Sequence, residues 1–431
     1  MITNYIFSEI AYALSHNRLC LFTGSGFTRA IAGDDAPTWH GLLVKVCENN
    51  GIDTTFLNDS PLSLEELAYL VAEKLNNKEK NIYIEISSVI EKIKLLDELN
   101  IDNIKIFFKN QKFHLITTNY DKLAESLIED DFHSLSPGKP IPKSSARVKV
   151  YHIHGSIDRP NDMVVTAEDY FKFINYESYF SRKLSVCLHE NLVVILGYSL
   201  SDTNLKAIIN EYKGFQSKQY IPSNIIFISR EEVSQPTKDY YLSCFGIRVV
   251  GGVEIEQFFE KINNTIEDVN NKRDSNVLSI KKVLSGKAKY KDTYLKTDIC
   301  LFEVISSIQA LGIDLLDEKV THLIKDILNR KIEFTRDNGA WEQYQHLALW
   351  LTYLNSIIHL SDSGLKEIIL ECTNISLSNC AETGTWGTPW GATKEWQVSW
   401  SNIIPSNRLI IKEYSREKLK NDFAKKQILG I

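Results

Sequence analysis

The chain has 431 residues, of which 43% are hydrophobic and 24% charged, and its formal net charge is −6. This length predicts about two or three domains with room for a sizeable core. The acidic balance excludes a protein that binds nucleic acid over its whole surface, so any such contact would need a local patch. The seven cysteines include no Cys-x-x-Cys pair and indicate neither a disulfide framework nor a zinc site.

The sequence carries no targeting or membrane signal. The N-terminus lacks a basic region followed by an apolar core, since Glu9 interrupts its early apolar residues. No apolar run approaches the roughly 18 residues that a membrane span needs. Scattered thiols are typical of a reducing compartment. We therefore expect a cytoplasmic protein without membrane contact.

The first expected strand, Leu19–Phe22, is an unbroken apolar run that follows an amphipathic helix expected over residues 3–16. It leads directly into Thr23-Gly24-Ser25-Gly26-Phe27. Two glycines spaced by one residue allow a tight turn and a close approach of N–H groups to a phosphate, and a helix starting there favours an anion. The stretch predicts a diphosphate site, with an ordinary strand–helix turn as the alternative.

Residues 40–110 have helical spacing almost throughout, which is too long for one crossover helix and predicts a helical subdomain beside the sheet. Further apolar, β-rich runs then alternate with helical patterns. They are Phe113–Thr117, Val148–His152, Asn191–Leu196, Ile225–Ser229 and Ile247–Val250. This alternation predicts an α/β fold with a doubly wound, mostly parallel, Rossmann-like sheet.

The composition changes after residue 262. Residues 263–298 are polar and contain eight Lys and Arg, which predicts a linker after a first domain of residues 1–262. Residues 299–431 show helical spacing again and predict a mainly helical C-terminal domain for assembly or sensing. Four tryptophans fall within Trp386–Trp400, which favours a core or a subunit contact over a platform for nucleobases.

Polar clusters follow three further strands where each strand ends. They are Thr118-Asn119-Tyr120-Asp121, then Ile153-His154-Gly155-Ser156, then Gly197-Tyr198-Ser199-Leu200-Ser201-Asp202. Open α/β sheets bind ligands at the carboxyl ends of their strands. Four clusters, counting Gly24-Ser25-Gly26, therefore predict one shared site, although turns also attract such residues for conformational reasons.

The chemistry of these residues points to a reaction. His154 suits proton transfer near neutral pH, and Gly155 gives a substrate room to approach. His152 points to the opposite face by strand alternation and is the weaker candidate. Asn119 offers both a donor and an acceptor for a ribose hydroxyl or a water.

Asp121, Ser199 and Asp202 are further candidates, and two of them have a structural alternative. Asp121 either acts electrostatically or caps the helix that follows it. Ser199 and Asp202 are placed to bind the hydroxyls of a second ribose, and Asp202 is equally suited to capping its own helix.

In this order and at these separations, the four motifs resemble the sirtuin-like NAD-binding domains of bacterial antiphage systems over roughly residues 10–260. The resemblance implies that Gly24, Ser25 and Gly26, with Phe27, line the diphosphate site. It implies that Asn119 and Asp121 border the nicotinamide ribose and that His154, beside Gly155, is the catalytic base. Gly197 and Ser199, with Asp202, are then expected near the adenosine end.

Two departures separate the chain from deacylating sirtuins. The span from Gly155 to Leu196 holds only Cys187, so the four-cysteine zinc module of the deacylases is absent. Ala36-Pro37-Thr38-Trp39 stands where deacylases have a Pro-Asp-Phe-Arg type segment. Both differences argue against protein deacylation.

The leading hypothesis is an NAD glycohydrolase that needs no metal and depletes NAD as an antiphage effector. Expected partners are NAD, further copies of the chain, and a phage-derived trigger or a partner ATPase. The alternative is a nucleotide-binding subunit that does not hydrolyse NAD and regulates a HerA-type ATPase. A dehydrogenase is disfavoured because Arg29 breaks the Gly-x-Gly-x-x-Gly pattern.

Overall fold

The computed structural model describes residues 2–58, 60–96, 99–138, 144–175, 186–199, 209 and 224–431. Within these ranges, seven strands form one sheet in the order β3-β4-β2-β1-β5-β6-β7, and every neighbouring pair is parallel. The strands are β1 (Leu19–Thr23), β2 (Phe113–Thr117), β3 (Phe132–Leu135), β4 (Val148–His152), β5 (Leu192–Leu196), β6 (Ile225–Ile228) and β7 (Ile247–Val250). The predicted parallel α/β sheet is confirmed.

The sheet is covered on both faces because its strands are apolar on both sides. Leu19 and Leu21 of β1 belong to one core, and Cys20 and Phe22 belong to the other. The first core is completed by helices α1 (Ile2–Ser15), α2 (Ser25–Ala32), α6 (Asp102–Asn110), α7 (Leu123–Ile128) and α12 (Ile255–Leu284). The second is closed in part by α11 (Gln235–Phe245). This is the doubly wound arrangement that alternating strands and helices predict.

Strand β3 was not expected from the sequence. Its four residues, Phe132–Leu135, lie at the edge of the sheet, and only Leu135 is buried. An edge strand so short and so exposed lacks the continuous apolar run that marks β1, β5 and β6.

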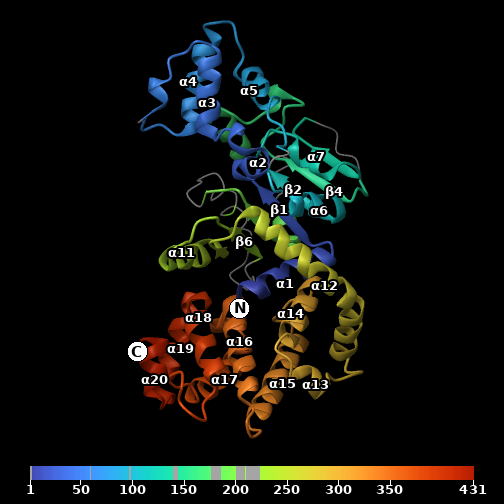
Figure 1. Cartoon of the computed structure of the whole chain (residues 1–431), viewed down its shortest axis with the longest axis vertical. Helices are drawn as coiled ribbons and strands as arrows, with labels where there is room; N and C mark the ends of the chain where they lie inside the picture. The colour runs from blue at the N-terminus through green and yellow to red at the C-terminus, as the bar shows by residue number, and fades with distance from the viewer. Residues whose placement is uncertain are drawn as a thin grey trace.

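The helical insertion forms its own small core beside the sheet. It contains α3 (Trp39–Asn49), α4 (Leu64–Asn76) and α5 (Ile82–Ile90), which lie together at one end of the molecule in Figure 1. Tyr120 and Met163 of the α/β part pack into this core. These contacts therefore hold the insertion next to the carboxyl ends of the strands.

The segment expected to be a linker is largely helical. Helix α12 continues without interruption to Leu284, and α13 (Asp292–Leu295) follows it. Phe258 and Ile262 of α12 pack under the sheet, while Ile280 packs in the C-terminal core. The polar composition reflects a helix that is largely exposed beyond residue 270. The division of the chain at residue 262 stays a prediction.

The C-terminal region is helical and has a core of its own (Figure 1). Its helices are α14 (Cys300–Ala310), α15 (Glu318–Thr335), α16 (Trp341–Ile357), α17 (Lys366–Ser378), α18 (Trp390–Ser399), α19 (Pro405–Lys418) and α20 (Asp422–Ala424). Trp350 and Trp396 are fully buried there, whereas Trp386 is 96% exposed. Among the helices described, none has both the length and the apolar character to cross a membrane.

Candidate functional site

The register of the sheet brings the predicted clusters together. Thr23 pairs with Thr117 of β2 and with Leu196 of β5, and Thr117 pairs with His152 of β4. The chain builds β2, β3 and β4 on one side of β1 before it crosses to β5 on the other. The end of β1 is therefore the point of topological reversal where α/β sheets bind ligands.

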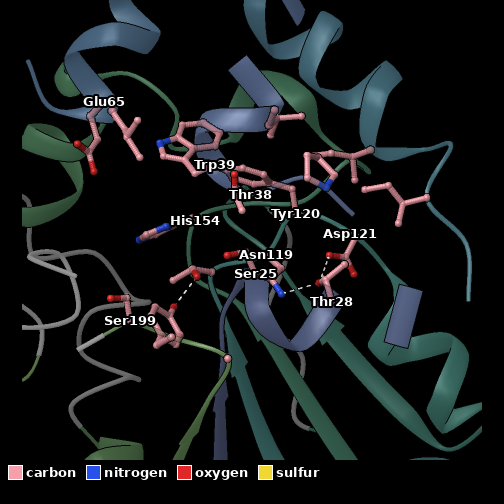
Figure 2. A pocket seen from close by; sticks show the side chains of 18 of the residues that line it. Ser25, Thr28, Thr38, Trp39, Glu65, Asn119, Tyr120, Asp121, His154 and Ser199 are labelled. Carbon is pink, nitrogen blue, oxygen red and sulfur yellow. Dashed lines mark hydrogen bonds between the residues drawn. The ribbon is translucent and has the colours of Figure 1, made fainter. Parts of the chain in front are cut away.

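A cavity of about 440 Å³ opens at this edge (Figure 2). Its size lies within the range of small-molecule sites, which is about 300–1,000 Å³. Six residues predicted from the sequence line it: Ser25, Asn119, Asp121, His154, Gly197 and Ser199. Gly24, Gly26, Phe27 and Gly155 are not among its lining residues. Asp202 lies outside the described residues.

The two glycines of the first turn are needed for packing against β5. The Gly24 N–H donates to the Leu196 carbonyl at 3.1 Å, and the Gly26 N–H donates to the Gly197 carbonyl at 2.9 Å. A Cβ on Gly26 would lie 2.8 Å from the Gly197 carbonyl oxygen. The N–H groups expected to face a phosphate are thus already bonded. Ser25 is the exposed residue of this turn on the cavity wall, at the start of α2.

Gly197 and Gly155 also have structural reasons to be glycine. Gly197 has φ +70°, and a Cβ there would lie 2.1 Å from the backbone nitrogen of Phe27. Gly155 has φ +88°, and its Cβ would meet Met163 at 2.8 Å. The Phe27 side chain itself is buried under the sheet, with its ring centroid 5.5 Å from that of Phe108.

Asn119 is held by hydrogen bonds to α2. Its Nδ2 donates to the Gly24 carbonyl and to Thr28 Oγ1, both at 2.8 Å. Thr28 in turn donates to Asp121 Oδ2 at 2.7 Å, as the dashed lines in Figure 2 show. A carbonyl oxygen can only accept, so this chain fixes which end of the Asn119 amide is nitrogen. Among the described residues, Oδ1 has no recorded donor and is left for a ligand.

Asp121 caps α7, which is one of the two roles that the sequence allowed, and it also lines the cavity. Its Oδ1 accepts the N–H of Leu123 at 3.1 Å, which is the first residue of α7. Burial raises the pKa of Asp121 above its usual range, against the hydrogen bond from Thr28 that lowers it. The carboxyl therefore ties α2 to α7 and also borders the cavity.

His154 is buried in an aromatic environment on the cavity wall. Its ring meets Tyr170 and Phe173 edge to face, with centroids 5.1 Å away in each case. Desolvation lowers the pKa of His154 to about 3, so the ring is neutral near pH 7. Its Nε2 is buried and has no hydrogen-bond partner among the described residues. Nδ1 lies 3.5 Å from the Tyr170 hydroxyl, so Nε2 is the ring nitrogen with an unmet hydrogen bond.

His152 lies off the cavity but contacts Asn119 from behind. Its ring is fully buried, with Nδ1 2.9 Å from the Asn119 carbonyl oxygen and Nε2 2.8 Å from Glu125 Oε1. Burial acts to raise the pKa of Glu125, but the hydrogen bond and charge of His152 and the nearby Lys122 outweigh it and lower that pKa to about 2.

The helical insertion supplies a wall that sequence reasoning did not assign to the site. Its lining residues come mainly from the starts of α3 and α4, and include Thr38, Trp39, Leu64 and Glu65 (Figure 2), while Ile90 adds the end of α5. The turn before Trp39 was a weak signal, whereas nothing in the sequence around Glu65 indicates a site. The lining residues described include Glu65 and Asp121 but no Lys or Arg.

Comparison with known proteins identifies the class. Residues 114–250, which run from β2 to β7, match the family model of the SIR2-like domain. This chain contains a SIR2-like domain, and the resemblance drawn from its motifs is confirmed.

Individual relatives are more specific. The chain is 26% identical over 199 residues to "NAD(+) hydrolase ThsA" of Bacillus cereus (strain MSX-D12), which covers 45% of this chain and 39% of that protein. It is 21% identical over 268 residues to "Defense-associated sirtuin 2" of Bacillus subtilis, covering 57% of this chain and 24% of the relative. The aligned parts thus span well under half of these relatives.

A third relative extends the similarity. The ThsA protein of Acinetobacter baumannii (strain 532279) is 24% identical over 359 residues, covering 75% of this chain and 69% of the relative. That share of the chain is larger than residues 1–262, so the similarity reaches into the C-terminal helices.

Proposed function

We propose that this protein hydrolyses NAD⁺ at the bond between nicotinamide and ribose, and that it acts as an antiphage effector that depletes NAD when triggered. The observation that carries the proposal is the meeting of Asn119 and His154 on one cavity at the end of β1. The SIR2-like match and the names of the relatives support NAD as the substrate.

The reaction needs few groups from the protein beyond those that position the substrate and the water. Nicotinamide leaves with the electron pair of the glycosidic bond and becomes neutral, while water bonds to the ribose carbon and loses a proton. The products are nicotinamide, ADP-ribose and that proton. Asn119 Oδ1 is the group proposed to hold the water or a ribose hydroxyl, because its amide hydrogens are already bonded to Gly24 and Thr28.

His154 is proposed to accept a hydrogen bond from the water or the ribose hydroxyl that loses the proton. With a pKa lowered to about 3 it is always unprotonated near neutral pH, yet too weak a base to keep a proton. It therefore acts by polarising the water or a ribose hydroxyl, and the proton passes on to solvent.

The carboxylates on the cavity wall fit this substrate. The nicotinamide of NAD⁺ carries a positive charge, which Glu65 and Asp121 would attract. The diphosphate would lie against Ser25, where the start of α2 offers the positive end of the helix dipole.

The test is nicotinamide release from NAD⁺ by the full chain. Asn119→Ala and His154→Ala are each expected to reduce turnover by about 100-fold or more, the scale of losing one group at a reacting centre. Matched controls are Asn379→Ala and His322→Ala, two exposed residues of the C-terminal helices, which should leave turnover unchanged.

A second arm addresses activation. NAD is measured in cells that express the chain, with and without phage infection. The measurement is repeated with and without co-expression of the protein that is encoded by the neighbouring gene. Tight NAD binding without turnover under every condition would contradict hydrolysis and favour the regulatory subunit of a HerA-type ATPase. Self-assembly, the trigger and a cytoplasmic location remain part of the proposal.

A further inference from the structure

Behind Asn119 lies a buried charged group that does not touch the cavity. His152 is 0% exposed and sits at the end of β4, while Glu125 comes from α7 and is 5% exposed. Glu125 Oε1 lies 2.8 Å from His152, 2.6 Å from Lys122 and 2.7 Å from the Ser134 hydroxyl. Lys122 also pairs with Asp158 at 3.2 Å.

The hydrogen-bond partners of His152 fix the orientation of its ring. The Asn119 carbonyl oxygen at Nδ1 can only accept, so Nδ1 carries a hydrogen and donates it. At Nε2 stands Glu125 Oε1, which also contacts Lys122 and Ser134, while Glu125 Oε2 is buried without a partner among the described residues. The ring is therefore held between the Asn119 carbonyl and the Glu125 carboxyl group.

This ring completes the anchoring of Asn119. The Asn119 N–H is bonded to Thr117 Oγ1 at 3.0 Å, and its side-chain amide is bonded to Gly24 and Thr28. His152 holds the remaining main-chain group, the carbonyl. With it, every polar atom of Asn119 except Oδ1 has a fixed partner within the described residues.

We propose that His152 is a positioning residue, which is held by Glu125, donates from Nδ1 to the Asn119 carbonyl and so aims Oδ1 into the cavity. This inference rests on the proposed function, because Asn119 is taken to act at the reacting centre. Reacting groups must be held to within a fraction of an ångström, and outer partners that hold them commonly contribute about 10–100-fold.

Two substitutions separate the two hydrogen bonds of the ring. In His152→Asn the amide nitrogen takes the place of Nδ1 and can still donate to the Asn119 carbonyl. In His152→Gln the amide nitrogen takes the place of Nε2, so the bond to Glu125 is kept and the bond to Asn119 is lost. His114→Gln, on the neighbouring strand β2 and off the cavity, controls for replacing a histidine in the sheet.

We expect His152→Gln to lower kcat for NAD⁺ hydrolysis about 10–100-fold with little change in KM. His152→Asn should recover most of that loss, and His114→Gln should match the wild type. A purely structural role would instead reduce the stability and the activity of both His152 variants in parallel. Equal kcat in His152→Gln and wild type would overturn the proposal.

A readout without turnover keeps this test separate from the proposed function. Histidine labelled with ¹⁵N should show one ring, absent in His152→Gln, that carries a hydrogen-bonded proton on Nδ1. The side-chain amide signal of Asn119, identified by its loss in Asn119→Ala, should move in His152→Gln and stay in His152→Asn. A His152 ring without a hydrogen on Nδ1, or an unmoved Asn119 signal, would overturn the positioning role, whereas absent hydrolysis by the wild type would instead remove the proposed function.

Discussion

Two of the regions that bury charged side chains differ in the space beside them. At the sheet edge, Glu125, His152 and Asn119 lead to a cavity of about 440 Å³. At the seam with the C-terminal helices, Arg248 forms two hydrogen bonds of 2.7 Å to Glu9, beside a cavity of about 60 Å³.

The difference separates a binding role from a stabilising role. A buried network beside a large cavity can pass its geometry to a ligand, whereas one between two packed parts of the chain holds those parts together. Burial and charge pairing are similar in both places, so neither property alone would have identified the site. The predictions below test this distinction.

The largest effect is expected at the seam. Arg248→Met leaves the Glu9 carboxylate buried without its partner, which should cost about 3–5 kcal/mol of unfolding free energy in urea denaturation. The double variant Glu9→Gln, Arg248→Met should recover part of that loss because no lone charge is left. Under conditions where the single variant stays folded, NAD⁺ affinity should not change, and a weakened affinity would break the comparison.

The next effect is expected where the cavity edge meets the core. Gly197→Ala places a Cβ 2.1 Å from the Phe27 nitrogen at φ +70°, and should cost about 2–4 kcal/mol through strain and overpacking. Gly286→Ala is the matched control, since φ is +73° but nothing lies within 4 Å of the added Cβ. Gly286→Ala should lower the free energy of unfolding by about 1 kcal/mol. Equal thermal shifts for the two variants would show that α2 does not press against β5 as described.

The smallest effect concerns Lys331, which is fully buried among the C-terminal helices. Its Nζ donates to Gln343 Oε1 at 2.7 Å and lies over the Trp350 ring at 4.1 Å. Burial lowers the pKa of Lys331 from 10.5 to about 8, although the charges of Cys300 and Asp298 act to raise it. Between these values the unfolded chain binds a proton that the folded chain does not, so the unfolding free energy gains from rising pH.

The measurement compares wild type with Lys331→Met. The unfolding free energy of wild type minus that of the variant should rise by about 1–3 kcal/mol between about pH 8 and pH 10. Other alkaline titrations are common to both proteins and largely cancel in this difference. A flat difference would show that Lys331 keeps its charge in the folded chain.

Much of the fold could be predicted from local sequence patterns. Strands β1, β5 and β6 are buried on both faces, so each is an apolar run that leads into a turn. Strand β3 has no such run, and its partners are set by tertiary pairing at the sheet edge. The linker predicted over residues 263–298 includes the end of helix α12. This part of the helix is mostly exposed to solvent, and its few apolar residues do not reveal the helical periodicity.

The site was predictable where it is built from strand ends. Ser25, Asn119 and His154 meet because parallel strands in register end at one edge. Glu65 could not be found this way, because a helical insertion places it over the cavity and its neighbours in sequence are ordinary helix residues. The contact of His152 with Asn119 was also hidden, since strand alternation correctly turns it from the cavity but says nothing of Glu125, a partner 27 positions earlier in the chain.

Helix α12 has a mechanical consequence. Its 30 residues form one continuous helix, about 45 Å along its axis, with Phe258 in the core under the sheet and Ile280 in the C-terminal core. Glu256 near its start accepts hydrogen bonds from Asn103 at the start of α6, and α6 leads into β2, which ends two residues before Asn119. A displacement of the C-terminal helices would therefore reach the site through a continuous helix and not through an unstructured linker.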